Sequence, residues 1–192
     1  MCANPEVELP ACFRAKSVFG DHVLTKARGD VQIFGRYYRN MERELGEAVR
    51  ELEAAKPDVP QRCHSVFEAE LLPTRWFYHT VRTHANFYES CQLRDFLLPF
   101  AKHGSKNPQE IIDAQAKYER WRAILLDERE NTSAAINVVQ QDSRLDVHNT
   151  RNGAALAPAR DLMHKKLELL NLELEVFLTS VMEEVQKPDS KP

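Results

Sequence analysis

Histidine and carboxylate side chains are the residues of this sequence with the greatest capacity for chemistry, because between helices they bind transition metals. In helical proteins with two carboxylate-bridged metals, two helices each carry Glu-x-x-His and two others each supply a glutamate. The sequence contains no Glu-x-x-His. His79 and His84 are five residues apart, about 140° around a helix, so they do not easily face one ion. We therefore predict no metal site and no cofactor from the available ligands, which are His64, Glu68, Glu70, His79, His84, Glu89 and Glu128.

A nucleophile beside a base would be a second source of chemistry. Cys63 and His64 are neighbours in the sequence, but no GxSxG or Cys-Gly-Ser-Cys motif is present. The glycine-rich phosphate loops GxGxxG and GxxxxGK are absent as well. We predict no catalytic residue in this chain.

Three residues are candidates for contact with a polar ligand or an adjoining domain. Asp142 and Arg144 flank the end of a predicted helix, where they form either a local cap with a salt bridge or a contact to such a partner. Trp76 belongs to an aromatic patch with Phe77 and Tyr78. Its indole either packs in the core, as aromatic residues at helical spacing usually do, or stacks on a sugar ring or a protein partner.

Polar residues interrupt two of the predicted apolar stripes. His84 and Asp95 lie in one stripe and Glu128 lies in another. An ionisable group inside a core has to be paired or neutralised. The three residues therefore either form a buried polar network, which would fix the register of the helices, or drift to the rim of the core.

Four long amphipathic helices are expected to position these residues. Apolar residues recur at alternating spacings of three and four over about 29–55, 61–100, 108–141 and 158–186, which is the period of an amphipathic helix. The first stripe is Val31, Phe34, Tyr38, Met41, Leu45, Ala48 and Leu52, and the last is Met163, Leu167, Leu170, Leu174, Phe177, Val181 and Val185.

Prolines and caps predict where the helices begin and end. Pro57 ends the first helix, and Pro73 is expected to break or kink the second, because proline lacks the N–H group and clashes with the preceding turn. Asn107 as N-cap and Pro108 at the first helical position start the third helix. Pro158 opens the last one.

The predicted fold class is all-α, an antiparallel bundle of four long helices with a short N-terminal lead-in helix over about 9–18. Matched rods with one apolar stripe each bury it best by lying side by side. Residues 1–20 are expected to be the lead-in segment, 21–187 the bundle and 188–192 a frayed tail. Residues 142–157 show no periodicity and predict a loop of about sixteen residues, a length that is uncommon in compact domains and often functional.

Charge and composition narrow the possible partners. The 26 Lys+Arg and 29 Asp+Glu give a net charge of -3 with both signs interspersed, which argues against a nucleic-acid partner. The sequence contains neither a basic and apolar export signal nor about 18 consecutive apolar residues, so no membrane partner is expected. The cysteines form no CxxC pair and are interpreted as buried thiols, at Cys2, Cys12, Cys63 and Cys91.

Several short motifs, taken in order along the chain, carry a family resemblance. They are Asn4-Pro5-Glu6-Val7, Phe13-Arg14, Val18-Phe19-Gly20, Phe34, Tyr37, Tyr38, Met41, Glu42, Glu130-Asn131-Thr132, Asp142-Ser143-Arg144-Leu145, Lys165, Lys166, Leu167 and Leu170. The chain resembles the helical region that follows the catalytic barrel in large bacterial glycoside-hydrolase-like proteins. This is a domain-of-unknown-function class whose layout is similar to that of α-glucuronidases and β-N-acetylhexosaminidases. The loop after Leu145 lacks the glycine and aromatic residues expected from that class, and the barrel is missing.

The resemblance implies that the chain is a fragment or a stand-alone remnant of such a protein, whose acid and base carboxylates lie on the barrel. The first hypothesis is therefore a non-catalytic helical module of a carbohydrate-processing protein, with the barrel or another protein as partner and carbohydrate as a further ligand. A parent of this kind would be secreted or periplasmic. The second hypothesis is an independent helical bundle that acts as an interaction or scaffold protein, and the third is a metal-binding four-helix enzyme. Only the first predicts a large apolar or aromatic surface left uncovered in the isolated chain.

Overall fold

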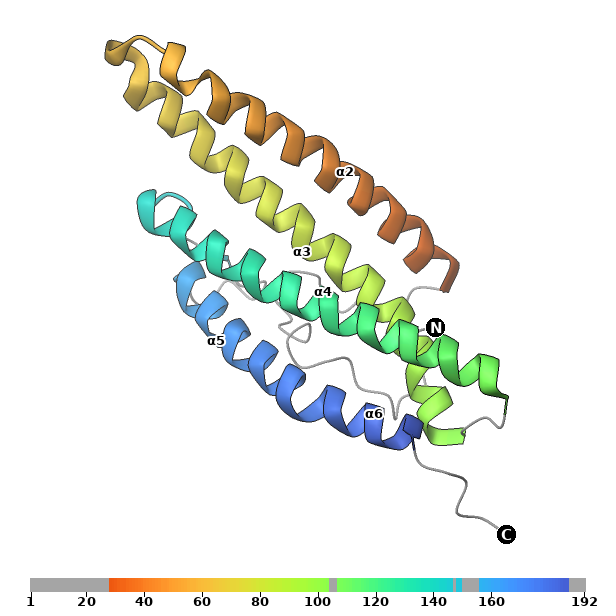
Figure 1. Ribbon diagram of the computed structural model, residues 1–192. Helices are drawn as coiled ribbons and strands as arrows, with labels where there is room; N and C mark the ends of the chain where they lie inside the picture. Colours follow the sequence, from red (N-terminus) through yellow and green to blue (C-terminus); the bar gives the residue numbers. More distant parts are fainter. Residues whose placement is uncertain (1–27, 104–106, 147, 150–155, 187–192) are drawn as a thin grey trace.

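The computed structural model describes residues 28–103, 107–146, 148–149 and 156–186, and almost all of these residues are helical. Four long helical runs lie side by side (Figure 1): α2 (Arg28–Ala55), α3 (His64–His103), α4 (Pro108–Gln141) and a last run from Ala159 to Gln186. The predicted all-α class with four helices is confirmed. The predicted lead-in helix over 9–18 and the tail 188–192 lie outside the described residues.

The ends of two helices follow the predicted proline and cap signals. Helix α2 ends at Ala55, and two short 3-10 turns, η3 (Lys56–Asp58) and η4 (Gln61–Cys63), connect it to α3. Asn107 caps α4, because its Oδ1 accepts a hydrogen bond from the backbone N–H of Gln109 at 3.0 Å. The start of α4 can be predicted from the local sequence because the N-cap residue and its hydrogen-bond partner are only two residues apart.

Of the break or kink predicted at Pro73, the break is wrong, because α3 continues as one helix of 40 residues through this position. Proline removes the N–H that would bond the carbonyl of residue i−4, here Ala69. The Nη2 group of Arg144 donates a hydrogen bond to that carbonyl at 3.1 Å. A partner distant in sequence therefore supplies the donor that Pro73 lacks.

The last helical run contains a π-helical segment that shifts its buried face. It consists of α5 (Ala159–Leu172), the π-helical η5 (Glu173–Phe177) and α6 (Leu178–Gln186). Met163, Leu170 and Val181 of the predicted stripe are buried, but so is Leu178, which the stripe omits. A π turn contains one residue more than an α turn, so the residues after it are rotated about the helix axis.

The segment between α4 and α5 is more structured than the predicted loop. Residues 143–145 form a turn, and strand β1 (His148–Asn149) pairs antiparallel with strand β2 (Leu156–Ala157). Each strand has only two residues, too few for an alternating pattern to be recognised in the sequence.

The apolar core lies mainly between α3, α4 and the last helical run. Trp121 of α4 is at its centre and is fully buried. A second cluster fills the end of the molecule where α4 meets α5, and Trp76 packs against it. The buried members of the main cluster are Val31, Phe87, Tyr88, Cys91, Leu97, Ala114, Tyr118, Trp121, Leu125, Leu170, Leu178 and Val181, and those of the second are Ala135, Ile136, Val139, Ala159 and Met163.

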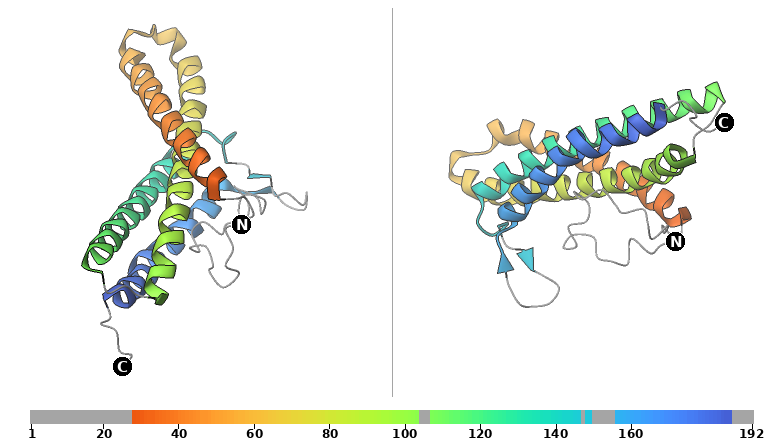
Figure 2. Two further views of the ribbon diagram at one scale, coloured as in Figure 1. Left: turned by 90° about the vertical axis from the view of Figure 1, so that its right-hand side faces the viewer. Right: turned by 90° about the horizontal axis from the view of Figure 1, so that it is seen from below.

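Helix α2 occupies an edge position, since among the described helices it makes its substantial contacts with α3 alone. Figure 2 shows the turn of the α2–α3 hairpin standing apart from the ends of α4 and α5. Only Val31 of the predicted α2 stripe is fully buried, and the line that faces α3 continues through Gly35, Gly46 and Val49. The contact face passes through the two glycines, where side chains of α3, Gln92 at Gly35 and Tyr78 at Gly46, occupy the space that a Cβ atom would meet.

Candidate functional site

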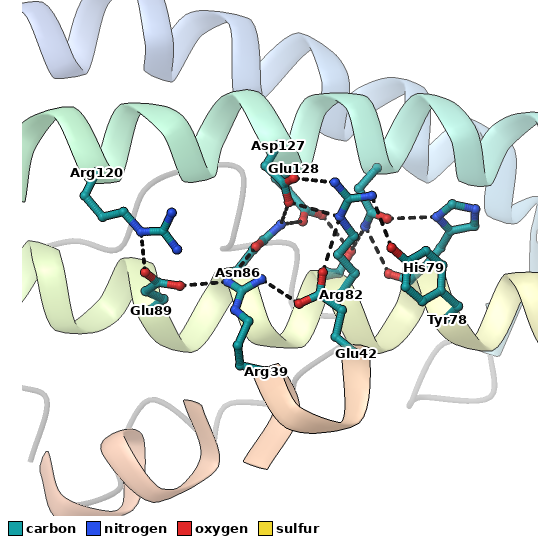
Figure 3. A network of polar contacts seen from close by, with 12 residues as sticks. Arg39, Glu42, Tyr78, His79, Arg82, Asn86, Glu89, Arg120, Asp127 and Glu128 are labelled. Carbon is teal, nitrogen blue, oxygen red and sulfur yellow. Dashed lines mark hydrogen bonds and ion pairs between the residues drawn. The ribbon is translucent and has the colours of Figure 1, made fainter. Parts of the chain in front are cut away.

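A layer of polar side chains crosses the middle of the molecule and includes residues from all four helical runs. Figure 3 shows its members on α2, α3 and α4. Glu128 of α4 lies at its centre and is fully buried. Its carboxylate accepts hydrogen bonds from Thr83 Oγ1 at 2.6 Å and Asn86 Nδ2 at 2.7 Å, and forms an ion pair with Lys166 of α5. A buried carboxylate is stable only when it is paired and hydrogen-bonded in this way.

A chain of hydrogen bonds extends the layer from Glu128 toward His79. The Nδ2 group of Asn131 donates to Thr83 Oγ1 and to the carbonyl of His79, both at 3.0 Å. Because its amide nitrogen is the donor in both bonds, its Oδ1 is the acceptor for the Nδ1–H of His79 at 2.8 Å. The hydrogen bonds therefore fix both the orientation of the Asn131 amide and the tautomer of His79.

Asn86 connects this centre to α2. Its two amide hydrogens bond two different carboxylates, Asp127 at 2.8 Å and Glu128 at 2.7 Å. Its Oδ1 accepts a hydrogen bond from Arg39 of α2 at 3.0 Å. Asp127 also forms an ion pair with Arg82 of α3. One asparagine of α3 thus links charged groups of α2 and α4.

The charged groups of the layer balance one another. Arg39 bonds Glu89 at 2.7 Å and Glu42 at 2.6 Å, and Arg120 of α4 bonds the other oxygen of Glu89 at 2.6 Å. The four cations are Arg39, Arg82, Arg120 and Lys166, and the four anions are Glu42, Glu89, Asp127 and Glu128. Such a layer is suited to holding helices in one register, because a shift of the helices would separate the buried carboxylate of Glu128 and the partly exposed ion pairs around it from their partners.

Burial and hydrogen bonding together set the protonation of Asp127, Glu89 and His79. Burial acts to raise the pKa of the Asp127 carboxyl, but hydrogen bonds from Arg82 and Asn86 outweigh it and hold the pKa below its usual value. Burial also acts to raise the pKa of Glu89, but the hydrogen bond and the charge of Arg120 outweigh it and lower that pKa. Burial lowers the pKa of His79, against the opposing effect of its bond to Asn131. At neutral pH both carboxylates are therefore ionised and His79 is neutral.

His84, Asp95 and Glu128, the polar residues that interrupt the predicted apolar stripes, lie in three different environments. Glu128 is the centre of the layer. His84 lies at its edge, where its ring stacks on Tyr38 at 4.8 Å between ring centroids and its Nδ1 donates to the carbonyl of Thr80 at 2.8 Å. Asp95 lies three turns further along α3, beside Arg94 at 2.5 Å. The structure therefore brings one of the three into the layer, one to its edge and one into a separate ion pair.

Asp142 and Arg144 are bonded to each other in the turn that follows α4. The guanidinium of Arg144 bonds both carboxylate oxygens of Asp142, at 2.6 to 2.9 Å, and the backbone N–H of Arg144 bonds Asp142 Oδ1 at 3.0 Å. The same guanidinium reaches the carbonyl of Ala69. Trp76 lies on the neighbouring surface of α3 and packs against the second core cluster. Asp142, Arg144 and Trp76 thus all have partners within the chain. A ligand or an adjoining domain that contacts them stays a prediction.

The histidines and cysteines do not converge in the part of the chain that the structure describes. No three His, Cys, Asp or Glu side chains there are grouped as a metal site would require. His64 bonds the carbonyl of Val59 at 2.8 Å. Cys91 is buried as predicted, but Cys63 is exposed because it lies in the η4 turn at the end of the hairpin. Among the described helices, none is apolar over a length that would cross a membrane.

Several members of the layer were missed by the sequence reasoning. Lys166, Asn86 and Asn131 were not identified as members of a polar network, because none of the three lies in a predicted apolar stripe and their partners are on other helices or at least 38 residues away in the sequence. A partial signal exists in α4, where Glu128, Asn131 and Thr132 have the spacing of one helix face. That face continues the apolar stripe of α4. The polar residues within the stripe are therefore the sequence feature from which the layer could have been predicted.

The α2–α3 interface has two unlike flanks. Ion pairs line the flank nearer to α4, namely Arg39–Glu89, Arg82–Glu42, Arg75–Glu53 and Lys56–Glu68. Aromatic stacking lines the opposite flank, where Tyr38 and Phe34 of α2 stack on Tyr88 of α3 at 5.5 and 5.6 Å. Helical spacing continues this opposite side as an apolar flank, which consists of Tyr37, Met41, Leu45, Ala48 and Leu52 on α2 with Val66 and Phe77 on α3.

Much of the apolar flank is open to solvent. Tyr37 is 60% exposed, Val66 65% and Phe77 47%, whereas Met41, Leu45 and Ala48 are half-buried. The flank remains open because α2 has α3 as its one substantial neighbour among the described helices. Exposed apolar side chains that share one side of a hairpin are a feature of sites where proteins or domains associate.

Comparisons with known proteins identify no relative of this chain. No protein-family model matches it, and no curated protein sequence and no solved structure is significantly similar to it. The family resemblance stated from the motifs therefore stays a prediction, and the function has to be argued from the polar layer and the apolar flank.

Proposed function

We propose that this chain is a non-catalytic helical module of a carbohydrate-processing, glycoside-hydrolase-like protein, and that it packs against a catalytic barrel elsewhere in that protein. In this proposal the four helices form an antiparallel bundle that a short lead-in helix precedes. The observation that carries the proposal is the apolar flank of the α2–α3 hairpin, where Tyr37, Leu52, Val66 and Phe77 are exposed and α2 has no substantial contact with a described helix other than α3. The order of motifs along the sequence supports the carbohydrate-processing parent.

The polar layer supports a structural rather than a chemical role for the interior. Each of its carboxylates is bonded to a cationic or amide side chain of another helix, so its charges serve the contacts between helices. Acid and base groups that act on a sugar would then belong to the barrel. The module would contribute a rigid surface on which the barrel is held.

The native form of the protein tests this proposal. An antibody against the chain is used to detect and immunopurify the native species from its source, and 4-nitrophenyl glycosides are used to assay hydrolysis. We expect a native polypeptide or complex much larger than 22.1 kDa, with glycosidase activity that the isolated 192-residue chain lacks. A native monomer of the size of the chain, with no activity in the immunopurified material, would contradict the proposal.

An independent interaction or scaffold protein is the second candidate, and the polar layer is the observation that favours it. The layer links all four helical runs through side chains of the chain itself, so the fold does not depend on a partner for its register. A native species of 22.1 kDa that is folded and monodisperse is the outcome expected from this candidate. The same immunoblot therefore distinguishes the two.

A further inference from the structure

Helix α2 is attached to the rest of the molecule by contacts of a different kind from those that hold α4. Of the α2 side chains that the structure describes, only Val31 and Val49 are buried. Helix α4 buries many more, among them Trp121, Ile124 and Leu125. The apolar surface that α2 removes from water is therefore much smaller, and so is the hydrophobic contribution to its docking.

Ion pairs supply much of the contact between α2 and α3. The side chains of these pairs are partly exposed to solvent, and each such pair contributes little by itself. Salt weakens exposed ion pairs by screening their charges. Four of them follow one interface, so the docking of α2 should depend on ionic strength more than the apolar core does. They are Arg39–Glu89, Arg82–Glu42, Arg75–Glu53 and Lys56–Glu68.

The polar layer keeps its charges paired without α2. Helix α2 contributes one cation, Arg39, and one anion, Glu42, and these two side chains are bonded to each other at 2.6 Å (Figure 3). Departure of α2 would therefore leave no buried charge of the layer without a partner of opposite sign. The pairs that remain join α3 to α4 and α4 to α5, and they are Glu89–Arg120, Arg82–Asp127 and Lys166–Glu128.

The connection between α2 and α3 has the properties of a hinge. Residues 56–63 form the turns η3 and η4, and no residue of either turn is buried. Val59, between the two turns, has an extended backbone. Pro57 and Pro60 keep α2 and α3 from joining into one continuous helix. A change of backbone angles at Val59 would therefore disturb few packed side chains, as is usual at hinges.

We propose that α2 opens as one unit about the hinge at residues 56–63, while α3, α4 and the last helical run stay folded. Ion pairs and ring stacking hold the closed state, and salt weakens it. Opening uncovers the face of α3 that carries Tyr78 and Tyr88, together with the edge of the polar layer at Asn86. Segments that move in this way come from the least stable part of a fold. The proposal does not depend on the proposed function.

Hydrogen exchange of backbone amides, followed by NMR on the full chain at increasing urea, tests this proposal. Under conditions where exchange reports the opening equilibrium, we expect the amides of Leu45 and Val49 to share one opening constant. It should exceed that of Trp121 and Leu170 by about tenfold or more. Its urea dependence should be smaller than that of global unfolding, because the opening of one helix exposes less surface.

Salt and matched variants test what holds α2 closed. An increase of NaCl from 0.02 to 0.5 M should speed exchange in α2 by about threefold or more and change exchange in α4 much less. Glu53→Gln with Glu68→Gln removes the partners of Arg75 and Lys56 and should have a similar effect in α2 at low salt.

A control pair of substitutions changes the net charge equally at exposed positions of α2. Glu47→Gln with Glu51→Gln should alter exchange in α2 much less than the pair at Glu53 and Glu68 does. Melting curves followed by circular dichroism verify that both double variants fold.

Several results would overturn the proposal. One is exchange in α2 with the same opening constant and urea dependence as in α4, since α2 would then unfold only with the whole chain. Others are exchange in α2 that is independent of urea, which indicates local fraying, and opening of the last helical run before α2. Equal exchange in the two double variants, or no response to salt, would show that ion pairs do not hold α2. The proposed function fails separately, on the size and activity of the native species.

Discussion

The guanidinium of Arg144 donates a hydrogen bond at 3.1 Å to the carbonyl oxygen of Ala69, the carbonyl whose helical partner Pro73 removes. This contact joins the turn after α4 to the N-terminal part of α3, across 75 residues of sequence. It explains why α3 continues through a proline, and it gives the Asp142–Arg144 pair a role within the fold. Asp142 holds the guanidinium in place through bonds to both of its carboxylate oxygens.

A double-mutant cycle between Arg144 and Pro73 measures this relationship. Arg144→Ala should lower the free energy of unfolding, because the carbonyl of Ala69 then has no donor. Pro73→Ala should raise the stability by up to about 3 kcal/mol, the difference between the two residues inside a helix. In the Pro73→Ala background the effect of Arg144→Ala should be smaller, since the N–H of the new alanine bonds Ala69. Urea denaturation of the four proteins gives the coupling, and additive effects would show that the contact is unimportant.

Removal of the cation at the centre of the polar layer should destabilise the fold strongly. Lys166→Met leaves the carboxylate of Glu128 buried and unpaired by any cation, which costs about 3 to 5 kcal/mol. The double variant Lys166→Met with Glu128→Gln should recover a large part of this loss, because a neutral amide needs no cation, its oxygen still accepts from Asn86, and its NH2 group can donate to the hydroxyl of Thr83. Chemical denaturation followed by circular dichroism measures both. Lys165→Met, which changes an exposed lysine one position earlier, is the matched control and should have little effect.

The two glycines at the α2–α3 interface should respond differently to substitution by alanine. A Cβ atom at Gly35 would lie 2.8 Å from the amide nitrogen of Gln92, the mobile end of an exposed side chain that can move away. At Gly46 it would lie 3.2 Å from Cε2 of the Tyr78 ring, which has less freedom. Alanine is favoured over glycine inside a helix by about 1 kcal/mol. Gly35→Ala should therefore raise Tm by more than Gly46→Ala does, and the reverse order would contradict this account of the interface.

Stability should fall as the pH is lowered, in two stages. Burial lowers the pKa of His79 and of His84 in the folded chain. As the pH falls through about 6.5, histidines of the unfolded chain bind protons while these two stay neutral, so the folded state loses stability. The lowered pKa values of Asp127 and Glu89 stabilise the fold above about pH 4, and this contribution is lost as the pH falls below that.

Histidine variants separate the first stage from the second. Urea midpoints at pH 7.5, 6.5, 5.5 and 3.5 describe the pH dependence of stability for each protein. His79→Gln with His84→Gln should flatten the curve between pH 7.5 and 5.5 and leave the loss at low pH unchanged. An unaltered slope in the upper range would mean that these two histidines do not titrate differently in the folded and unfolded chain.

Local chemistry explains which parts of the fold were predictable. Asn107 and Pro108 start α4 through a hydrogen bond only two residues away, and Pro57 follows the end of α2. The repeat of apolar residues at three and four positions predicted four long helices. Each of these signals acts within a few residues, so it is complete in the sequence.

The candidate site depends on contacts that no local pattern contains. Asn86 bonds groups on α2 and α4, Lys166 of α5 reaches Glu128 of α4, and Pro73 is tolerated because Arg144 lies beside Ala69. The π-helical segment also changes which face of the last run is buried.

The sequence by itself determined the helices, most of their ends and the absence of long apolar or basic segments, because periodicity, caps and composition are local properties. Only the tertiary structure decided that α2 packs at an edge through Gly35 and Gly46, which of its side chains remain open on the apolar flank, and which polar residues meet in the interior. The physical reason is that burial and pairing are properties of two surfaces brought together, and a residue's partner can lie anywhere along the chain.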